Sequence, residues 1–364
     1  MRISFVLPCS GRYPIGGFRI IYEYANRLAE RGHAVTLVHL IAPQPEQLSR
    51  ERYWKSMLQY WRDRSTGRYL PSDWFRLDPR VTTTCHFSLD ARAIPDGDVI
   101  IASAWQTADG VVQAGSQAGR KFYFIQHYET WNSDHAALTA TWRLPLKKIV
   151  IAAWLKEIAV GLDETADIVP NAIDHDFFHT VIPPEQRADG SILLQSHRLD
   201  WKGTKDAIKA LRILRDRGLS FDLTLFGLTR PEASDIDFPY QFVLNPPQSE
   251  LKRLYSQTSI FIAPSWSEGW GLTPHEAGAC GAALAVTDIG GHKEFLVQGR
   301  TALMSPPCDV VALADNVEHL LQDSPFRIQL AYRAAQELRR FDWKRSVSDF
   351  EKILSDTSSG ERDS

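Results

Sequence analysis

The sequence is poor in cysteine, and its four cysteines are far apart. They are Cys9, Cys85, Cys280 and Cys308. None forms a Cys-x-x-Cys pair, and no histidine lies at metal-ligand spacing, so the pattern predicts neither a disulfide framework nor a zinc site. A reducing compartment suits such a chain, and we expect a cytoplasmic protein.

Long hydrophobic runs are also missing. The longest unbroken apolar run, residues 149–155, is far below the ~20 residues that a membrane-spanning helix needs. The opening residues, MRISFVLP, hold one basic residue and an apolar stretch that stops at Pro8, too short for the core of a signal peptide. We therefore expect no membrane crossing, and peripheral contact with the inner face of the membrane stays an open option.

Charge of one sign is not in excess, because 41 Lys and Arg stand against 44 Asp and Glu, a net charge of −3. Nucleic-acid-binding domains are usually strongly basic, so we expect no nucleic-acid partner, and an anionic ligand must be met by local cations. The composition is that of a globular protein, with 44% hydrophobic and 23% charged residues. A chain of 364 residues exceeds the usual size of one core, which favours two domains.

Each half of the chain alternates strands with helices. In the first half, an apolar run at residues 2–7 leads through Gly16 and Gly17 into a helical period, and a second strand follows at 34–40. Further strands are expected at 99–102, 121–126 and 168–170. The second half has expected strands at 192–196, 223–226, 260–264 and 282–287, with helices at 204–217 and from Leu272. A strand, helix and strand in this order require a parallel sheet with right-handed crossovers.

Two consecutive α/β halves predict two Rossmann-like domains with ligands at the carboxyl ends of their strands. We place the first domain at residues 1–170 and the second at 171–341. Residues 357–364 read as a flexible, solvated tail.

Two segments interrupt the alternation. Residues 49–78 are rich in Arg, Trp and Tyr, and residues 142–159 combine three lysines with a large apolar face. The first segment suits contact with a carbohydrate or with an anionic, lipid-linked molecule at a membrane surface. It suits equally a solvated helical face whose aromatic side chains pack inward, and both interpretations stay open.

The most specific signal is the sequence SWSEGWGLTPHEAGACG at residues 265–281. Glu268 lies on a glycine-rich loop after a strand, and Glu276 lies inside the helix that this loop opens. Backbone amides at such a helix start can converge on an anion. The residues expected to contact the ligand there are Gly269, Trp270, Gly271, Leu272 and Thr273. The alternative is that the two glutamates merely favour an exposed helix N-terminus.

Arg198 and Lys202, in SHRLDWKGTKD, supply local positive charge between a strand and a helix. Cations at a helix N-terminus oppose its dipole, so they need another reason to be there, and a bound anion is one. Lys205 is an alternative cation, and a solvated basic loop is the structural alternative. In the first half, Gly16 and Gly17 let a backbone approach phosphate or sugar oxygens, unless they only form a tight turn.

The segment at 265–281 resembles the Glu-x7-Glu signature of family 4 glycosyltransferases, which are retaining enzymes. The resemblance extends over nearly the whole chain and is strongest over residues 191–295. It implies an α/β GT-B fold, in which two Rossmann-like parallel-sheet domains face an interdomain cleft. It also implies that a C-terminal helix over 342–356 packs back on the first domain.

The resemblance assigns roles to the residues above. Glu276 would bind the ribose hydroxyls and Glu268 the donor sugar, while Arg198 and Lys202 would neutralise the diphosphate. Their spacing is one residue shorter than the commonest family pattern. Further expected contacts are Gly16 and Gly17 with the diphosphate or the acceptor, His127 and Glu129 with the transferred sugar or the acceptor hydroxyl, and Phe226 and Gly227 with the base. The alternative for His127 is a packing residue at a strand end.

The implied reaction transfers a sugar from a nucleotide-diphosphate sugar to a hydroxyl of a carbohydrate or lipid-linked acceptor. In front-face retention the departing phosphate oxygen accepts the acceptor's proton, so no cofactor and no metal are expected. Asp174-His175-Asp176 and Asp235-Ile236-Asp237 match an Asp-x-Asp pattern, but such matches arise frequently by chance. IQHYE and EGWGL are similar to segments of bacterial polysaccharide glycosyltransferases, including rhamnosyl-transferring ones, which implies a dTDP- or UDP-linked deoxysugar or hexose.

Two other functions are compatible with the same fold. One is a nucleotide-sugar epimerase or phosphorylase, although these do not usually carry the EGWGL context. The other is a non-catalytic subunit that binds a nucleotide-sugar as a scaffold. A silent protein would have no chemical reason to keep Glu268, Glu276, Arg198 and Lys202 together.

Overall fold

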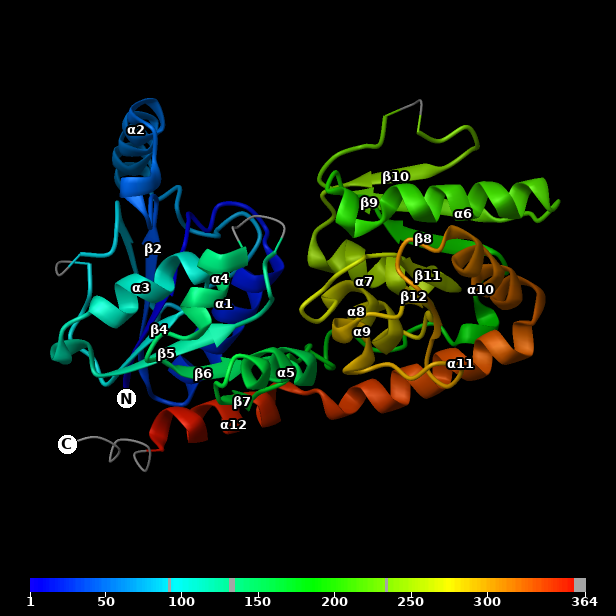
Figure 1. Cartoon of the computed structure of the whole chain (residues 1–364). Coiled ribbons are helices and arrows are strands. Elements are labelled where there is room, and N and C mark those ends of the chain that lie inside the picture. The colour runs from blue at the N-terminus through cyan, green and yellow to red at the C-terminus, as the bar shows by residue number, and fades with distance from the viewer. Residues whose placement is uncertain (91–92, 131–134, 233–234, 357–364) are drawn as a thin grey trace. The chain divides into compact units, whose positions relative to one another are not determined.

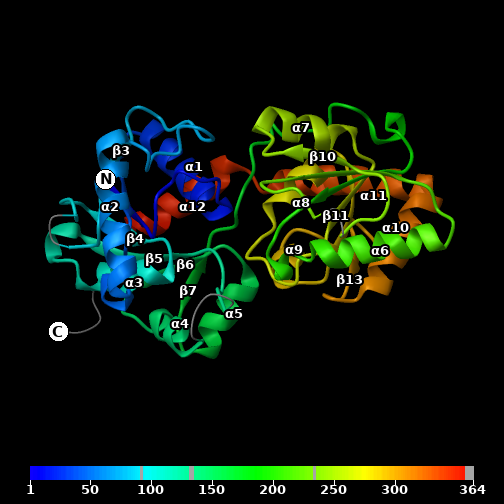
Figure 2. The same cartoon turned by 90° about the horizontal axis from the view of Figure 1, so that it is seen from above.

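A computed structural model describes residues 1–90, 93–130, 135–232 and 235–356 of the chain. It divides into two compact units, one formed by Met1–Asn171 with Lys344–Ser364 and the other by Ala172–Trp343. Each unit contains a parallel sheet with helices on both faces (Figure 1, Figure 2). The predicted α/β class with two Rossmann-like domains is thus confirmed, whereas the predicted tail at 357–364 lies outside the described residues.

The sheet of unit 1 has seven parallel strands in the order β3-β2-β1-β4-β5-β6-β7. The strands are β1 (Arg2–Leu7), β2 (Ala34–Leu40), β3 (Thr82–His86), β4 (Val99–Ala102), β5 (Arg120–Ile125), β6 (Lys147–Val150) and β7 (Ala166–Ile168). The helices are α1 (Gly16–Glu30), η1 (Pro45–Gln47), α2 (Arg50–Thr66), α3 (Trp105–Gln113), η2 (Ser116–Ala118), α4 (His135–Trp142), α5 (Ala153–Gly161) and, from the C-terminus, α12 (Trp343–Ser355).

The sheet of unit 2 has six parallel strands in the order β10-β9-β8-β11-β12-β13. The strands are β8 (Ser191–Gln195), β9 (Asp222–Gly227), β10 (Gln241–Leu244), β11 (Ile260–Ala263), β12 (Ala283–Thr287) and β13 (Leu303–Ser305). The helices are η3 (Pro184–Gln186), η4 (Asp200–Lys202), α6 (Thr204–Asp216), α7 (Gln248–Gln257), α8 (Leu272–Ala279), α9 (Gly290–Lys293), α10 (Val310–Gln322), α11 (Ser324–Glu337) and η5 (Leu338–Arg340).

The central strands are continuous apolar runs because helices bury both of their faces. Every residue of β4 and every residue of β11 is buried. In unit 1, β1 lies between β2 and β4, and Ile3 is paired with Val35 on one side and Val99 on the other. The strands that the sequence predicted most clearly are therefore the ones at the centres of the two sheets.

Helix α12 belongs to unit 1 from Lys344 onward, although it is the last helix of the chain. Phe350 lies in the core of this unit, where its ring is 6.1 Å from that of Phe5, 4.4 Å from that of Tyr24 and 5.2 Å from that of Phe124. The apolar stripe of the C-terminal segment thus packs against the first strand, the first helix and β5.

The two irregular segments form ordinary elements. Residues 50–66 form α2, and residues 147–161 include helix α5 and strand β6, which lies between β5 and β7. The basic residues of the second segment obscured this strand. Lys148 is buried because its Nζ donates to the carbonyls of Leu144 and Leu146 and to a carboxylate oxygen of Glu164, at 3.1, 3.2 and 2.8 Å. None of the described helices has the length and apolar character needed to cross a membrane.

Candidate functional site

The carboxyl edge of the unit 2 sheet carries the predicted glutamates and lysine. Strand β8 pairs with β9 on one side and β11 on the other, so the order of connection reverses between β8 and β11. Ligands of open parallel sheets bind at such a reversal. The loop after β8 carries Lys202, and the loop after β11 carries Glu268.

Lys202 and Glu268 form an ion pair across these two loops. Lys202 Nζ donates to Glu268 Oε1 at 2.7 Å, and Ser265 Oγ donates to the same oxygen at 2.8 Å. The side chains are 23% and 17% exposed, so the pair is half-buried and still accessible from solution. The sequence analysis did not predict this pairing, because 66 residues separate the two positions.

Hydrogen bonds from Trp266 hold the loop after β11 against the loop after β8 and the start of α6. The amide of Trp266 donates to the carbonyl of Trp201 at 2.7 Å, and the indole of Trp266 donates to Asp206 Oδ2 at 2.7 Å. Gly203 adopts a φ of +69°, and a Cβ there would lie 2.0 Å from the carbonyl oxygen of Pro264. Glycine is therefore required next to Lys202 for the two loops to approach this closely.

The pKa of Glu268 is lowered despite its burial. Burial is the largest single influence and raises the pKa of the carboxyl group, but the charge of Lys202, the hydrogen bonds from Lys202 and Ser265 and the neighbouring His292 together outweigh it. Glu268 is consequently a carboxylate at neutral pH. It can accept hydrogen bonds from hydroxyl groups, while Lys202 presents a positive charge beside it.

Glu276 lies in helix α8 and is 2% exposed. One of its oxygens, Oε2, accepts a hydrogen bond from the hydroxyl of Tyr255 at 3.2 Å. A glutamate is almost never this deeply buried without a specific role or partner. The structure thus contradicts the alternative of an exposed helix start, at least for Glu276.

The turn from Gly269 to Gly271 precedes α8 and packs closely against Gly291 and His292 of α9. Gly271 has a φ of +103°, and a Cβ there would lie 2.8 Å from the ring of His292. A Cβ on Gly291 would lie 2.4 Å from the carbonyl oxygen of Glu268. The start of α9 therefore supports the loop that carries Glu268. No side chain caps the first turn of α8, which begins at Leu272.

The side chain of Trp270 serves packing. The indole is buried, stacks on Phe295 at 5.3 Å and donates from Nε1 to His275 Nδ1 at 2.9 Å. Its predicted contribution to ligand binding thus rests on its backbone amide. Thr273, the second residue of α8, lies with its hydroxyl 3.5 Å from the side-chain oxygen of Gln195 at the end of β8.

His292 is a residue of this site that the sequence analysis missed. It is 1% exposed, and its Nδ1 donates to the carbonyl of Thr287 at 2.9 Å. Within the described part of the chain, Nε2 has no hydrogen-bond partner. Burial lowers the pKa of His292, against the opposing effects of the Thr287 carbonyl and Glu268. The only signal in the sequence was its place in GGHKE, directly after a buried strand.

The other predicted cations differ in their surroundings. Arg198 is exposed in the bend after β8, and it makes no ion pair with any described residue. Lys205 pairs with Asp200 at 2.9 Å, and both side chains are 67% exposed. Of the three cations, Lys202 is the one that contacts a predicted glutamate.

Phe226 and Gly227 end strand β9. Phe226 is 3% exposed, and its ring lies 6.0 Å from that of Tyr255 and 6.5 Å from that of Phe261. A Cβ on Gly227 would lie 2.3 Å from the carbonyl oxygen of Ser196, so glycine lets β9 approach the loop after β8. Both residues therefore serve packing, and contact with a base would have to involve their backbone.

Gly16, Gly17 and His127 belong to unit 1, a different unit from Glu268. They lie at the carboxyl edge of its sheet, where Gln126 Nε2 donates to the carbonyl of Gly17 at 3.0 Å. The ring of His127 meets that of Trp154 edge-on at 5.7 Å. Nearby, burial raises the pKa of Glu129, although a hydrogen bond from Trp105 partly opposes this.

The two Asp-x-Asp sequences have local structural roles. Asp174 Oδ1 accepts from the amides of Asp176 and Phe177 at 3.0 and 3.1 Å, and Asp237 pairs with Arg212 at 2.9 Å. Across residues 1–90, 93–130, 135–232 and 235–356, no three His, Cys, Asp or Glu side chains come together as a metal site would require.

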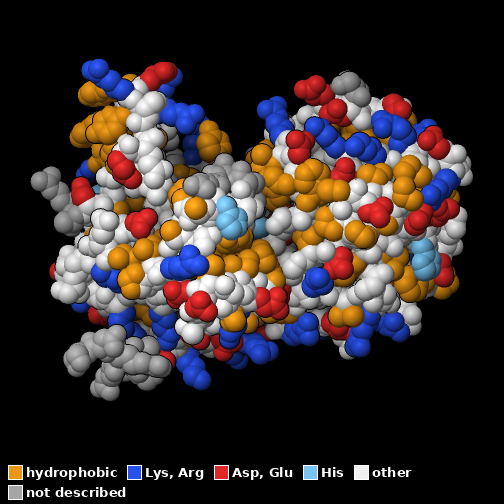
Figure 3. Space-filling view, in the orientation of Figure 1, with side chains coloured by type: hydrophobic (Ala, Val, Ile, Leu, Met, Phe, Trp, Pro, Cys, Tyr) orange, Lys and Arg blue, Asp and Glu red, His pale blue; other side chains and the backbone are white. Residues whose placement is uncertain are grey.

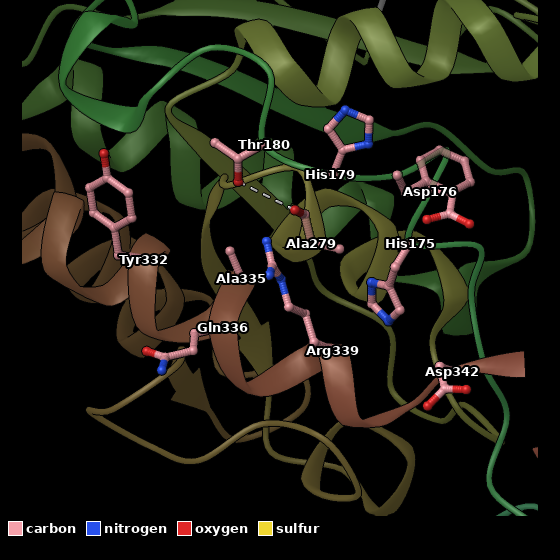
Figure 4. Close-up of a pocket in the computed structure, with 11 residues that line it drawn as sticks. His175, Asp176, His179, Thr180, Ala279, Tyr332, Ala335, Gln336, Arg339 and Asp342 are labelled. Carbon is pink, nitrogen blue, oxygen red and sulfur yellow. Dashed lines mark hydrogen bonds between the residues drawn. The ribbon is translucent and has the colours of Figure 1, made fainter. Parts of the chain in front are cut away.

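A pocket of about 840 Å³ lies elsewhere in unit 2, near the C-terminal end of α8 (Figure 4). His175, His179 and Arg339 line it, and Thr180 Oγ1 donates to the carbonyl of Ala279 at 3.4 Å beside it. None of the predicted site residues lines this pocket.

Comparison with known structures defines the fold class. Sucrose-phosphate synthase from Thermosynechococcus elongatus superposes with a TM-score of 0.73 at 16% identity, over 97% of this chain and 98% of that one. Anabaena HepE in complex with UDP and glucose also has a TM-score of 0.73 at 16% identity, over 98% and 99% of the two chains. The fold is GT-B, the fold of these structures.

Comparison of sequences identifies the domain. Residues 182–337 match the family model described as glycosyl transferases group 1. D-inositol 3-phosphate glycosyltransferase from Arthrobacter sp. (strain FB24) is 28% identical over 202 residues, 50% of this chain and 48% of the relative. Glycogen synthase from Mycobacterium tuberculosis is 32% identical over 180 residues, 47% of this chain and 44% of the relative.

A third relative is named for a lipid-linked acceptor. N,N'-diacetylbacillosaminyl-diphospho-undecaprenol alpha-1,3-N-acetylgalactosaminyltransferase from Campylobacter jejuni is 24% identical over 224 residues, 61% of this chain and 58% of the relative. The chain thus spans about half the length of the curated relatives it matches. Unit 2 carries a glycosyl transferases group 1 domain, and Lys202, Glu268 and Glu276 all lie inside the matched residues.

Proposed function

We propose that this chain is a retaining, family 4-like glycosyltransferase that moves a hexosyl or deoxyhexosyl group from a nucleotide-diphosphate sugar to a hydroxyl of a carbohydrate or lipid-linked acceptor. The observation that carries the proposal is the Lys202–Glu268 ion pair at the carboxyl edge of the unit 2 sheet, followed in the same loop and helix by the buried Glu276. A cation, a carboxylate and a second, buried carboxylate are what a diphosphate, a sugar and a ribose require.

Each group has a distinct task in this proposal. The ammonium group of Lys202 contacts the donor's diphosphate as well as Glu268. The exposed Arg198 adds a second positive charge from the same loop. Compensating the charge of the departing diphosphate stabilises the transition state for cleavage of its bond to the sugar. Glu268, kept ionised, accepts hydrogen bonds from the sugar hydroxyls and orients the ring. Glu276 accepts from the ribose hydroxyls.

We propose a front-face mechanism without a metal. The acceptor hydroxyl attacks the anomeric carbon on the side from which the phosphate leaves, and the departing phosphate oxygen takes the proton. The bond to phosphate breaks and the new glycosidic bond forms on the same face of the sugar, so configuration is retained. His127 and the Gly16-Gly17 turn of unit 1 would contact the transferred sugar, the acceptor or the diphosphate, and unit 1 would bind the acceptor.

The comparisons support the substrate classes in this proposal. The Anabaena structures contain UDP, UDP-glucose, or UDP and glucose, and the Campylobacter relative is named for a diphospho-undecaprenol acceptor. We propose a nucleotide-sugar donor, a carbohydrate or lipid-linked acceptor in polysaccharide biosynthesis, and a cytoplasmic protein peripheral to the inner face of the membrane. No nucleic acid takes part.

The test is to incubate the protein with UDP-, dTDP- and GDP-linked sugars and an acceptor, with and without EDTA. We expect nucleotide release from one donor, undiminished by EDTA, and a product whose anomeric proton coupling in NMR matches the donor's configuration. Loss of turnover with EDTA would refute the metal-free mechanism, and an inverted product would refute retention. A changed sugar without nucleotide release would indicate an epimerase, dependence on inorganic phosphate a phosphorylase, and binding without turnover a scaffold.

A further inference from the structure

Helix α2 (Arg50–Thr66) of unit 1 packs with one face only. Tyr60 and Asp63 are buried on that face, and the rings of Tyr53 and Tyr60 lie 5.1 and 6.1 Å from that of Phe87. Ser49 caps the helix start by accepting from the amide of Arg52 at 3.3 Å. The helix is therefore a defined element whose inward side is already occupied.

The outward face of α2 carries three large apolar side chains, which we call the α2 stripe. Trp54, Leu58 and Trp61 are 59%, 71% and 61% exposed. Their spacing of four and three residues places them in one row along the helix. Single exposed apolar residues are ordinary on a protein surface, but three large ones in a row mark an interaction site.

Cations surround the α2 stripe. Within α2, five Arg and Lys stand against two acidic residues, although the whole chain has a net charge of −3. Arg50 lies one turn before Trp54, and Arg62 lies one turn after Leu58. Arg50, Arg52 and Arg68 are exposed and make no ion pair with a described residue. Figure 3 shows apolar and basic side chains gathered at the protruding α2 of Figure 1.

We propose that the α2 stripe docks on a bilayer with anionic headgroups. The indoles and Leu58 would enter the interface between headgroups and acyl chains, where tryptophan is favoured, and the flanking Arg and Lys would contact the headgroup phosphates. Charge complementarity selects this partner, because Arg50 at one end of the apolar row and Arg62 at the other, which is exposed although it pairs with Asp63, match an extended negative plane. The proposal rests on the proposed function only in that a lipid-linked acceptor would lie in the same bilayer.

The experiment is co-sedimentation of the full chain with vesicles of phosphatidylcholine alone or of phosphatidylcholine with phosphatidylglycerol. The stripe variant is Trp54→Ser/Leu58→Ser/Trp61→Ser, and the charge variant is Arg50→Gln/Arg62→Gln. The matched control, Val311→Ser/Tyr332→Ser, removes apolar side chains that are 54% and 45% exposed in unit 2. Circular dichroism and the Tm of each variant check that every variant folds.

We expect the parent and the control to bind the anionic vesicles, and binding to fall as salt is raised. The stripe variant should lose at least about tenfold in partition coefficient, and the charge variant should lose its preference for anionic over neutral vesicles. Unchanged binding by the stripe variant, or no binding by the parent at low salt, would overturn the proposal. So would self-association through the stripe without vesicle binding, which would indicate a protein partner.

The outcomes separate this proposal from the proposed function, because vesicle binding is measured without a nucleotide-sugar. A protein that binds vesicles but transfers no sugar would overturn the proposed function alone. A protein that transfers sugar to a soluble acceptor but ignores vesicles would overturn the membrane-docking proposal and the peripheral location, but not the proposed transfer reaction.

Discussion

At the scale of single residues, the candidate site depends on how two carboxylates differ. Glu268 is half-buried, ionised and shared between Lys202 and Ser265, whereas Glu276 is buried and accepts from Tyr255. In the proposed function the first would exchange its partner for the donor, and Lys202 is still reached by solvent. The second is held in place before any ligand arrives.

Replacing Lys202 with methionine keeps the length of the side chain and removes its charge. If Lys202 stabilises the departing diphosphate, kcat/KM for the donor should fall by about 10²- to 10³-fold, while Tm changes little. Initial rates of nucleotide release measure this. Lys205→Met is the matched control, because it removes the same charge from the first turn of α6, close to Lys202 in the chain, but only from an exposed pair with Asp200. A larger loss in the control would assign the role to Lys205.

Replacing Glu276 with glutamine keeps its shape and removes its charge. Hydrogen bonds to a charged acceptor are stronger than those to a neutral one, so affinity for the free nucleotide should weaken by about tenfold, measured by calorimetric titration. Tyr255→Phe removes the positioning hydrogen bond but leaves the carboxylate, and should weaken binding less. Equal affinities of Glu276→Gln and the parent would show that Glu276 does not contact the nucleotide.

At the scale of elements, the site depends on two loops from neighbouring strands. The loop after β8 and the loop after β11 are joined by the Trp266–Trp201 backbone hydrogen bond and by the close approach at Gly203. The Lys202–Glu268 pair can form only while these loops stay in contact. Gly203 is thus a structural requirement of the site, although it carries no functional group.

Alanine at Gly203 should be more damaging than alanine at Gly218. Both glycines have positive φ, +69° and +81°, but a Cβ on Gly218 meets nothing within 4 Å. Gly218→Ala should cost about 1 kcal/mol from backbone strain alone. Gly203→Ala should cost more in urea unfolding and also lower donor turnover, because the Lys202 loop must move away from Pro264. Equal effects on both quantities would show that the loop contact is unimportant.

At the scale of the whole molecule, each unit has buried histidines that depend on staying neutral. Burial lowers the pKa of His39 in unit 1 to about 4 and that of His275 in unit 2 to about 3. The ordinary value in the unfolded chain is 6.5. Below pH 6.5 the unfolded chain therefore binds more protons than the folded one. As the pH is lowered, the free energy of unfolding decreases until the pH reaches the pKa of the histidine in the folded chain.

We expect Tm to decrease between pH 6.5 and pH 4.5, because the unfolded chain protonates its histidines across this window while His39 and His275 of the folded chain stay mainly neutral. Each buried histidine should contribute roughly 2 to 3 kcal/mol of this loss. His275→Phe places an apolar ring among Trp270, Phe295 and Phe341. The Tm of unit 2 should then depend less steeply on pH. His319→Gln, at an exposed position, should leave this dependence unchanged. A Tm that is constant or rises toward pH 4.5 would contradict this account.

Much of the local structure could be predicted because it depends on neighbouring residues. The apolar runs of β1, β4 and β11 and the glycine loop before α8 are local patterns, and they placed Glu268 on a loop and Glu276 on a helix. Strands β3, β6, β10 and β13 were not predicted, because they are short or carry polar residues such as Lys148. For Lys148, the hydrogen bonds that offset its burial come from outside its own strand.

The sequence by itself determined the α/β class, the division into two halves and the residue types available at the candidate site. Only the tertiary structure decided that Lys202 pairs with Glu268, that Gly203 lies against Pro264, that His292 supports the loop and that Trp54 and Trp61 face outward. The physical reason is that periodicity reports burial along one segment. Contacts between loops depend on the order of strands in the sheet, which brings positions 66 residues apart within a hydrogen bond.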